Sequence, residues 1–165
     1  TTWCVKGGAL LIVGMVALLT GCADNVVYQA DVPVPAGAWN RTFTPKFEFD
    51  ITDTVQQHDV YIDVRHTGQY PFSALFLSVQ LDGQGGRALR DTVDCLLADP
   101  TGRWYGKGLG FIFADRFQAK VLYKLRNRFP SAGRYSITLE QAMRTEELNG
   151  VLDIGVSVER AKAGG

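Results

Sequence analysis

The 165-residue sequence has few of the side chains from which catalytic and metal sites are built. It contains two histidines, His58 and His66, and three cysteines, Cys4, Cys22 and Cys95. No Cys-x-x-Cys pair occurs, which argues against a structural zinc site, and three cysteines at unrelated spacings do not make a disulfide framework. Neither histidine has a partner at metal-ligand spacing, and no Gly-x-Ser-x-Gly elbow is present. We therefore expect a protein that is not an enzyme and needs no metal or cofactor.

A net charge is also missing, since 17 lysines and arginines balance 17 aspartates and glutamates. A balanced total gives no sign of nucleic-acid binding. The glycine-rich stretch "GKGLG" at 106–110 lacks the GxxxxGK[ST] pattern of a phosphate-binding loop, so we expect no small-molecule ligand there. His58 lies in a predicted loop, where a lone histidine is typically solvated. Cys95 shares a face with Val93 and Leu97, which predicts a small core residue.

Long hydrophobic runs are absent except at the N-terminus, where no charge occurs from Gly7 to Gly21. Fifteen residues are too few for a membrane span of about 20 but fit the apolar region of a signal peptide. The run follows Lys6 and ends in Leu19-Thr20-Gly21-Cys22, which resembles the bacterial lipobox. That resemblance implies cleavage before Cys22 and a diacylglyceryl group on its sulfur. The alternative is an uncleaved anchor with an accidental cysteine.

Alternation of apolar and polar residues dominates the rest of the chain and is typical of half-buried strands. The predicted strands lie within residues 43–52, 60–65, 74–81, 91–97, 134–142 and 152–159. Turn signals separate them, and Asn149-Gly150 is the strongest hairpin cue. Segment 111–129 is ambiguous between a strand and a short helix that leads into one. The pattern predicts an all-β protein, an antiparallel β-sandwich of the jelly-roll type.

The predicted organisation is a signal peptide over 1–21, a lipidated N-terminus with a tether or edge segment over 22–40, one β-sandwich domain over 41–160, and a tail over 161–165.

Charge is distributed unevenly along this domain. Residues 24–99 hold 11 acids and 5 bases, whereas residues 103–134 hold 8 bases and 1 acid. In "KVLYKLRNR" the alternation turns Val121, Tyr123 and Leu125 inward and presents a cationic face of Lys120, Lys124, Arg126 and Arg128. Such a face suits anionic lipid headgroups or an acidic partner surface. The alternative is an ordinary solvated face, neutralised by the acidic first half of the domain.

Aromatic residues gather in the same basic stretch, around Trp104 and Tyr105. Exposed aromatic rings on a sandwich can stack on sugars, which makes a carbohydrate-binding surface lipoprotein the alternative function. More often such rings belong to the core or to a protein–protein contact.

Several stretches resemble the GldH family of gliding-motility lipoproteins, and together they run through nearly the whole chain after Cys22. They are "KFEFDITDT", "YIDVRHTGQYPFSALFLSV", "RDTVDCLLADPTGRWYGKGLG", "ITLEQAMR" and "GVLDIGVSVE". The resemblance implies a non-enzymatic envelope lipoprotein of the gliding machinery, linked to type IX protein secretion. Its partners would be the membrane, through acylated Cys22, and other proteins of that apparatus.

The resemblance also bears on location and modification. Ala23 rather than aspartate follows Cys22, which favours the outer membrane, with the periplasmic face preferred. Periplasmic proteins of such bacteria can carry O-glycans at Asp-Thr followed by an apolar residue. That pattern makes Thr54 and Thr92 candidate O-glycosylation sites, with Thr54 in a predicted loop and Thr92 near the start of a strand.

Overall fold

The computed structural model describes residues 25–86, 88–108 and 115–163, which form strands and one short 3₁₀ turn, η1 (Pro35–Gly37). The strands are β1 (Val26–Pro33), β2 (Ala38–Asn40), β3 (Lys46–Ile51), β4 (His58–His66), β5 (Ala74–Gly83), β6 (Leu89–Leu96), β7 (Lys107–Gly108), β8 (Phe117–Asn127), β9 (Gly133–Gln141), β10 (Glu147–Asn149) and β11 (Val151–Arg160). Within these residues no helix is long and apolar enough to cross a bilayer.

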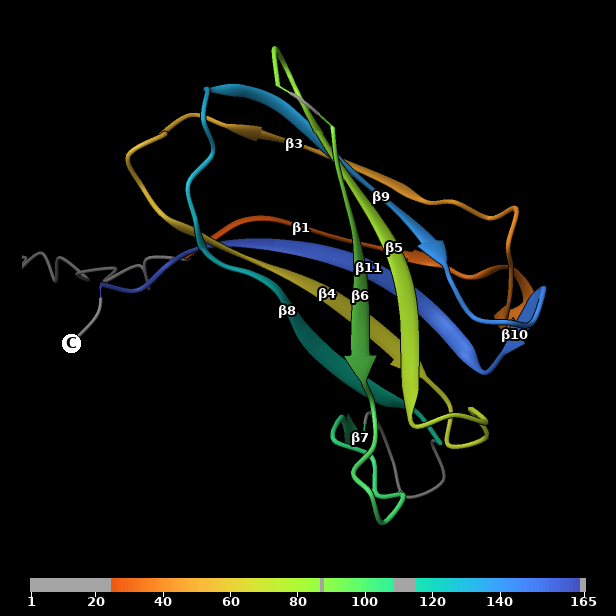
Figure 1. The fold of residues 1–165 in the computed structure, drawn as a ribbon. Coiled ribbons are helices and arrows are strands. Elements are labelled where there is room, and N and C mark those ends of the chain that lie inside the picture. Colours follow the sequence, from red (N-terminus) through yellow and green to blue (C-terminus); the bar gives the residue numbers. More distant parts are fainter. Residues whose placement is uncertain (1–24, 87, 109–114, 164–165) are drawn as a thin grey trace, which may run out of the picture.

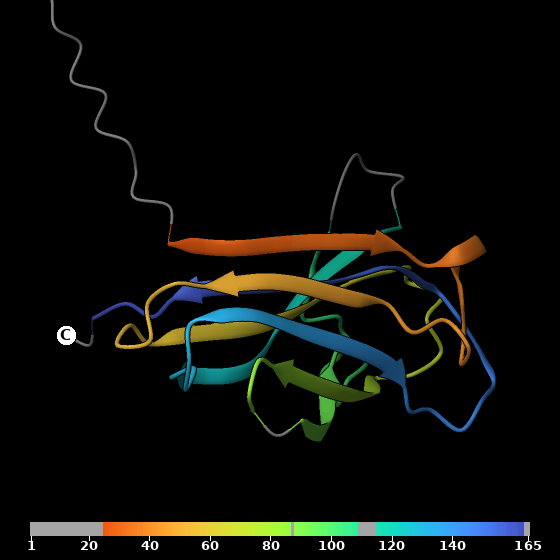
Figure 2. The ribbon, with the colours of Figure 1, turned by 90° about the horizontal axis from the view of Figure 1, so that it is seen from above.

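Two antiparallel sheets pack face to face as a β-sandwich (Figure 1, Figure 2). The larger sheet has the order β1-β11-β4-β8-β7, the smaller one β3-β9-β5-β6, and β10 pairs separately with β2. The long strands alternate between the sheets, apart from the β5–β6 hairpin, and this order is that of a jelly roll. The all-β fold class expected from the sequence is therefore confirmed. Residues 26–33, expected in a tether or edge segment, form the edge strand β1.

The core lies between the sheets and is built from every second strand residue. In β3, Phe47, Phe49 and Ile51 are at most 3% exposed, whereas the charged residues between them face solvent. The alternate apolar residues of β5 and β9 are buried in the same way. Each such side chain contributes about 1.5–3 kcal/mol on burial, so the period of two dictates which face of each strand turns inward.

Polar residues of β4 are buried as well, among them Asp63 and His58. Asp63 is 4% exposed, because β4 lies between β11 and β8 and Ser157 on β11 donates a 2.9 Å hydrogen bond to its Oδ2. His58 is the first residue of β4 and is 3% exposed, with its ring centroid 5.6 Å from that of Phe129. The expectation of a solvated loop histidine at residue 58 is therefore wrong.

The ambiguous segment 111–129 contains the long strand β8, whose alternation stops before its end. Val121 and Tyr123 are half-buried as expected, but Leu125 is 65% exposed, so the inward orientation expected for it is wrong. Arg126 has a φ of 47°, and the pairing of β8 with β4 shifts register twice. Such irregularities rotate the strand and end the alternation.

The Asn149-Gly150 turn does not close a hairpin. It joins β10, which pairs with β2, to β11, which pairs with β1 and β4. Gly150 has a φ of +95°, and a Cβ at this position would lie 2.9 Å from the Tyr70 Cα. The left-handed turn and the close contact with the loop after β4 both require glycine.

Strand register shows which residues meet at each end of the sandwich. At one end β4 and β11 pair His58 with Arg160, β4 and β8 pair His58 with Asn127, and the Arg160 N–H donates to the Asn25 carbonyl at 2.7 Å. We call this the N-terminal end, because the described chain enters there (Figure 1). At the far end, β4 finishes and β8 begins. The two ends of the sandwich lie about 30 Å apart, the length of β8 at ~3.3 Å per residue.

Candidate interaction surfaces

The structure divides the four bases of the predicted cationic face into two pairs. Lys120 forms an ion pair with Glu159, and its Nζ lies 4.3 Å from the centroid of the Tyr61 ring. The Nζ of Lys124 lies 2.9 Å from Asp91 Oδ2. Both positive charges therefore meet carboxylates on other strands, as in the solvated-face alternative.

Asp91 also joins the two sheets at their open side. Its Oδ2 accepts a 2.6 Å hydrogen bond from the Tyr123 hydroxyl in addition to the contact with Lys124. The hydrogen bond from Tyr123 and then that from Lys124 lower the pKa of Asp91. Burial, followed by the bond to Asp91, raises the pKa of the Tyr123 hydroxyl. This cluster fixes the position of β6 against β8.

Arg126 and Arg128 are exposed at the N-terminal end, and neither side chain forms an ion pair with a described carboxylate. The contact of Arg126 with Asp59 runs through the backbone, since its N–H donates to Asp59 Oδ1 at 2.7 Å. The uncompensated part of the predicted stripe is thus confined to these two arginines.

A cleft of about 640 Å³ opens between the edges of β6 and β8 near the far end. Ala119 and Val121 of β8 line it, with Leu96 of β6 and Tyr105 at its rim. Leu96 is 57% exposed and Tyr105 59% exposed. Ligand-sized cavities span about 300–1,000 Å³, so the cleft can receive a side chain or a small ring.

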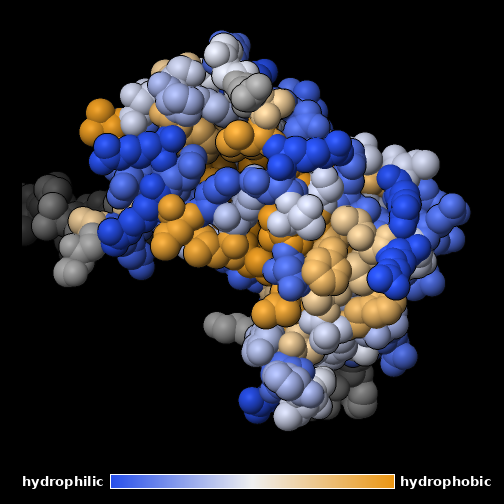
Figure 3. Space-filling view, viewed as in Figure 1, coloured by the Kyte–Doolittle hydropathy of each residue, from blue (hydrophilic) through white to orange (hydrophobic). Residues whose placement is uncertain are grey.

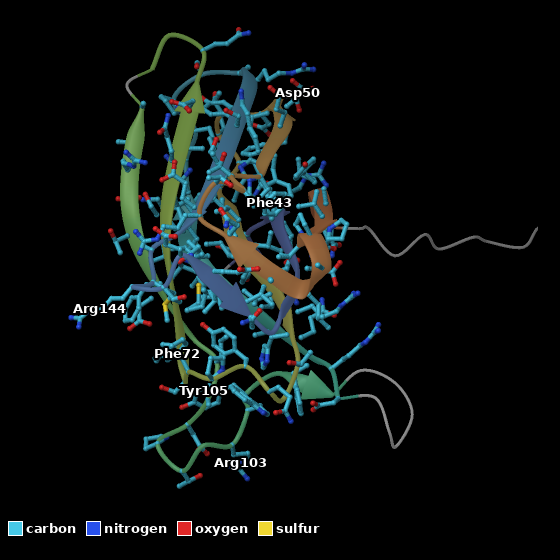
Figure 4. All side chains as sticks on the ribbon, turned by 90° about the vertical axis from the view of Figure 1, so that its right-hand side faces the viewer. Phe43, Asp50, Phe72, Arg103, Tyr105 and Arg144 are labelled. Atoms are coloured by element: carbon cyan, nitrogen blue, oxygen red, sulfur yellow. The ribbon has the colours of Figure 1, made fainter. Side chains whose placement is uncertain are left out.

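A second groove of about 500 Å³ lies at the far end of β5, lined by Phe72, Phe76 and the segment 142–145. Phe76 points outward from the smaller sheet, and Leu96 lies diagonally across from it on the same face. Figure 3 shows orange atoms gathered over the lower part of β5 and β6 with blue atoms around them. We call Phe72, Phe76, Leu96 and Tyr105 the far-end surface, and Figure 4 shows two of its members, Phe72 and Tyr105, at this end.

Sequence reasoning missed Phe72 and Phe76, although a signal for Phe76 was present. In "ALFLSVQL" it occupies the face opposite Leu75 and Leu77, where a solvated strand carries polar residues. Exposed aromatic side chains grouped in this way mark contact sites.

Trp104, which the sequence offers as a sugar platform, packs inside the far end. Its ring centroid lies 4.7 Å from that of His66 and 6.0 Å from that of Phe117. The indole is half-buried, and the neighbouring Tyr105 is the aromatic residue that reaches solvent at the cleft. Any sugar-stacking role in this region therefore falls to Tyr105.

The titratable side chains buried in the described part of the chain include His58, His66 and Cys95. The Nδ1–H of His66 donates to the Thr67 carbonyl at 2.9 Å, while its Nε2 is buried and has no hydrogen-bond partner among the described residues. Burial lowers the pKa of both His58 and His66 and keeps them neutral near pH 7. Burial also raises the pKa of the Cys95 thiol to about 12, which suits the expected core residue. No group of three metal-ligating side chains occurs within the described residues.

The remaining sequence predictions concern covalent modification. Cys22, the predicted lipidation site, lies outside the described residues. Thr54 is half-buried in the loop between β3 and β4, and Thr92 is exposed on the outer face of β6. Both threonines remain predictions.

The fold defines a class, which is an all-β domain of the jelly-roll type. Comparison with known sequences gives the family. The model of the GldH lipoprotein family matches residues 26–158, and the chain belongs to that family. A gliding motility lipoprotein GldH homolog from Christiangramia forsetii is 28% identical over 153 residues, 88% of this chain and 91% of the relative. The gliding motility lipoprotein GldH of Flavobacterium johnsoniae is 27% identical over 163 residues, 94% of this chain and 98% of the relative.

Solved structures resemble the chain more distantly. A family GH115 4-O-methyl-α-glucuronidase gives a TM-score of 0.44 at 13% identity, over 83% of this chain and 18% of that one. A CBM28 carbohydrate-binding module specific for non-crystalline cellulose gives a TM-score of 0.38 at 12% identity, over 82% of this chain and 75% of that one. At these values neither likeness carries an argument about function.

Proposed function

We propose that this protein is a lipid-anchored component of the gliding-motility machinery that acts without catalysis, by holding a partner protein at its far-end surface. The proposal includes an anchor at Cys22, residence in the outer membrane with the periplasmic face preferred, and a link to type IX protein secretion. Family membership over nearly the whole described chain supports the gliding role. The observation that carries the contact role is the group of exposed aromatic and aliphatic side chains at the end away from residue 25.

The partner contact is tested by Phe76→Glu in the full-length protein of a gliding host. A charge placed in the wall of the groove opposes apolar packing, so we expect a loss of gliding with unchanged membrane retention and unchanged stability. A photoreactive residue at position 72 should crosslink one discrete envelope protein, and Phe76→Glu should abolish that crosslink. The matched control is Leu89→Glu, which changes an exposed apolar residue at the start of β6, outside the far-end surface. Normal gliding of the Phe76→Glu protein would refute the role of this surface.

Carbohydrate binding remains a second candidate because Tyr105 is exposed beside a cleft that also presents Asp94 and Gln118. Aromatic rings with nearby polar groups are suited to stacking on a sugar face and bonding its hydroxyls. A glycan array with the full-length protein would separate the candidates. Specific sugar binding that Tyr105→Ala abolishes would favour this second function over the first.

A further inference from the structure

The N-terminal end of the sandwich combines exposed apolar side chains with uncompensated arginines. Val55 and Leu125 are 78% and 65% exposed, the two highest values among the large apolar residues described. Leu125 precedes Arg126 and Arg128 at the end of β8, and Val55 lies in the loop before β4. In Figure 3 orange and blue atoms are interspersed at the left, where this end lies. Apolar tips beside basic residues are characteristic of protein surfaces that lie in a bilayer interface.

Strand pairing brings these residues together around the entry point of the chain. Asn127 pairs with His58, and Ala161 donates its N–H to the Gln57 carbonyl at 2.8 Å, which holds the loop of Val55 beside the end of β11. Val26 begins β1 at the same end, where it pairs with Glu159, and is itself 39% exposed. The end surface is therefore one region built from four strands.

Chain length fixes how far this region can lie from the anchor. Only three residues separate Cys22 from Val26. A fully extended chain spans at most about 3.6 Å per residue, so the start of β1 stays within about 14 Å of Cys22. The polar interface of a bilayer leaflet is itself several ångströms thick. An acyl group on Cys22 would keep the start of β1 close to the lipid headgroups, and Val55, Leu125 and the two arginines lie at the same end of the sandwich.

Three acidic residues of this end make local contacts, none of them with the side chain of Arg126 or Arg128. Glu159 pairs with Lys120, Asp59 accepts the backbone N–H of Arg126, and Asp53 accepts the backbone N–H groups of Val55 and Gln56. The two arginine side chains have no described carboxylate partner. Basic side chains near a membrane surface are attracted to anionic lipid headgroups.

We propose that the N-terminal end, formed by Val26, Val55, Leu125, Arg126 and Arg128, is a docking surface for anionic phospholipid headgroups. It orients the domain so that the far-end surface points away from the bilayer. The inference rests on the Cys22 anchor of the proposed function.

The test uses the acylated full-length protein reconstituted in vesicles of phosphatidylcholine alone or with phosphatidylglycerol. Amide hydrogen exchange of residues 125–128 should be roughly tenfold slower on the anionic vesicles, and added salt should remove the difference. Exchange at residues 96–105 should be the same on both. The double variant Arg126→Glu with Arg128→Glu should lose the slowing. The matched control, Arg103→Glu with Arg144→Glu, makes the same charge change at the far end and should keep it.

The outcomes separate this inference from the proposed function. Intact mass showing an acyl chain, together with equal exchange on both vesicles, would overturn the headgroup contact and leave the anchor standing. Loss of the slowing in the far-end control as well would also overturn it, because net charge alone would then explain the effect. A mature mass without an acyl chain would overturn the anchor and, with it, this inference.

Discussion

At the scale of single residues, His66 has the clearest energetic consequence. Its ring is fully buried among Trp104, Tyr70 and Phe117, and no residue that the structure describes bonds its Nε2. Burial lowers the pKa of His66 in the folded protein, whereas the unfolded chain titrates near 6.5. Below that pH the unfolded chain binds the proton more readily. The free energy of unfolding therefore falls as the pH drops through this range.

We predict that His66→Phe weakens this pH dependence. Removing one titrating group reduces the slope of the unfolding free energy by up to about 1.4 kcal/mol per pH unit between pH 7 and 5. Denaturant unfolding of both proteins across that range measures the slope. His58 and Asp63 remain in both proteins, so their contributions cancel in the comparison. Equal slopes would show that His66 accepts a proton in the folded state without penalty.

At the scale of elements, the turn at Gly150 connects the β10–β2 pair to the larger sheet. Its φ of +95° and the 2.9 Å approach of a Cβ to Tyr70 both oppose any side chain. We predict that Gly150→Ala lowers the free energy of unfolding by about 2–4 kcal/mol, from backbone strain and the steric clash together. Gly85→Ala is the matched control, because Gly85 has a φ of +71° but nothing within 4 Å. Comparable losses in the two variants, measured by urea unfolding, would rule out the contact with Tyr70.

Individual strands could be predicted from the sequence, but their contacts with other strands could not. Strands such as β3, β5 and β9 follow from their alternation, because one face of each is buried by the opposite sheet. The burial of Asp63 does not follow, since it depends on which strands flank β4 and on the hydroxyl of Ser157. The ion pairs of Lys120 with Glu159 and of Lys124 with Asp91 could not be predicted either, because each carboxylate is distant in sequence from its lysine. Local pattern therefore predicted a cationic face on β8, and only the tertiary fold divides it.

At the scale of the whole molecule, the sandwich separates two kinds of surface. The N-terminal end combines arginines with exposed aliphatic side chains, and the far end presents exposed aromatic rings beside the cleft and the groove. β8 runs from one to the other, and the Asp91 cluster links β8 of the larger sheet to β6 of the smaller one. If Cys22 carries the anchor, this rigid body converts a membrane attachment at one end into a fixed presentation of the other.

That arrangement predicts a dependence on tether length. Four residue steps join Cys22 to Val26, and inserting about sixteen Gly and Ser residues there makes the tether roughly five times longer. The local concentration of the N-terminal end at the headgroups falls with the −3/2 power of tether length, by about tenfold. We expect the slow exchange of residues 125–128 on anionic vesicles to be largely lost, although the protein stays acylated and membrane-bound.

The control inserts the same sequence between Gly85 and Gly86, in the loop joining β5 to β6, where it leaves the tether unchanged. This protein should exchange like the unmodified one at residues 125–128. If the long tether preserved the slowing in full, the N-terminal end would bind headgroups strongly enough without the anchor, and a short tether would not be what orients the domain. The short connection between Cys22 and β1 would then serve only to attach the protein.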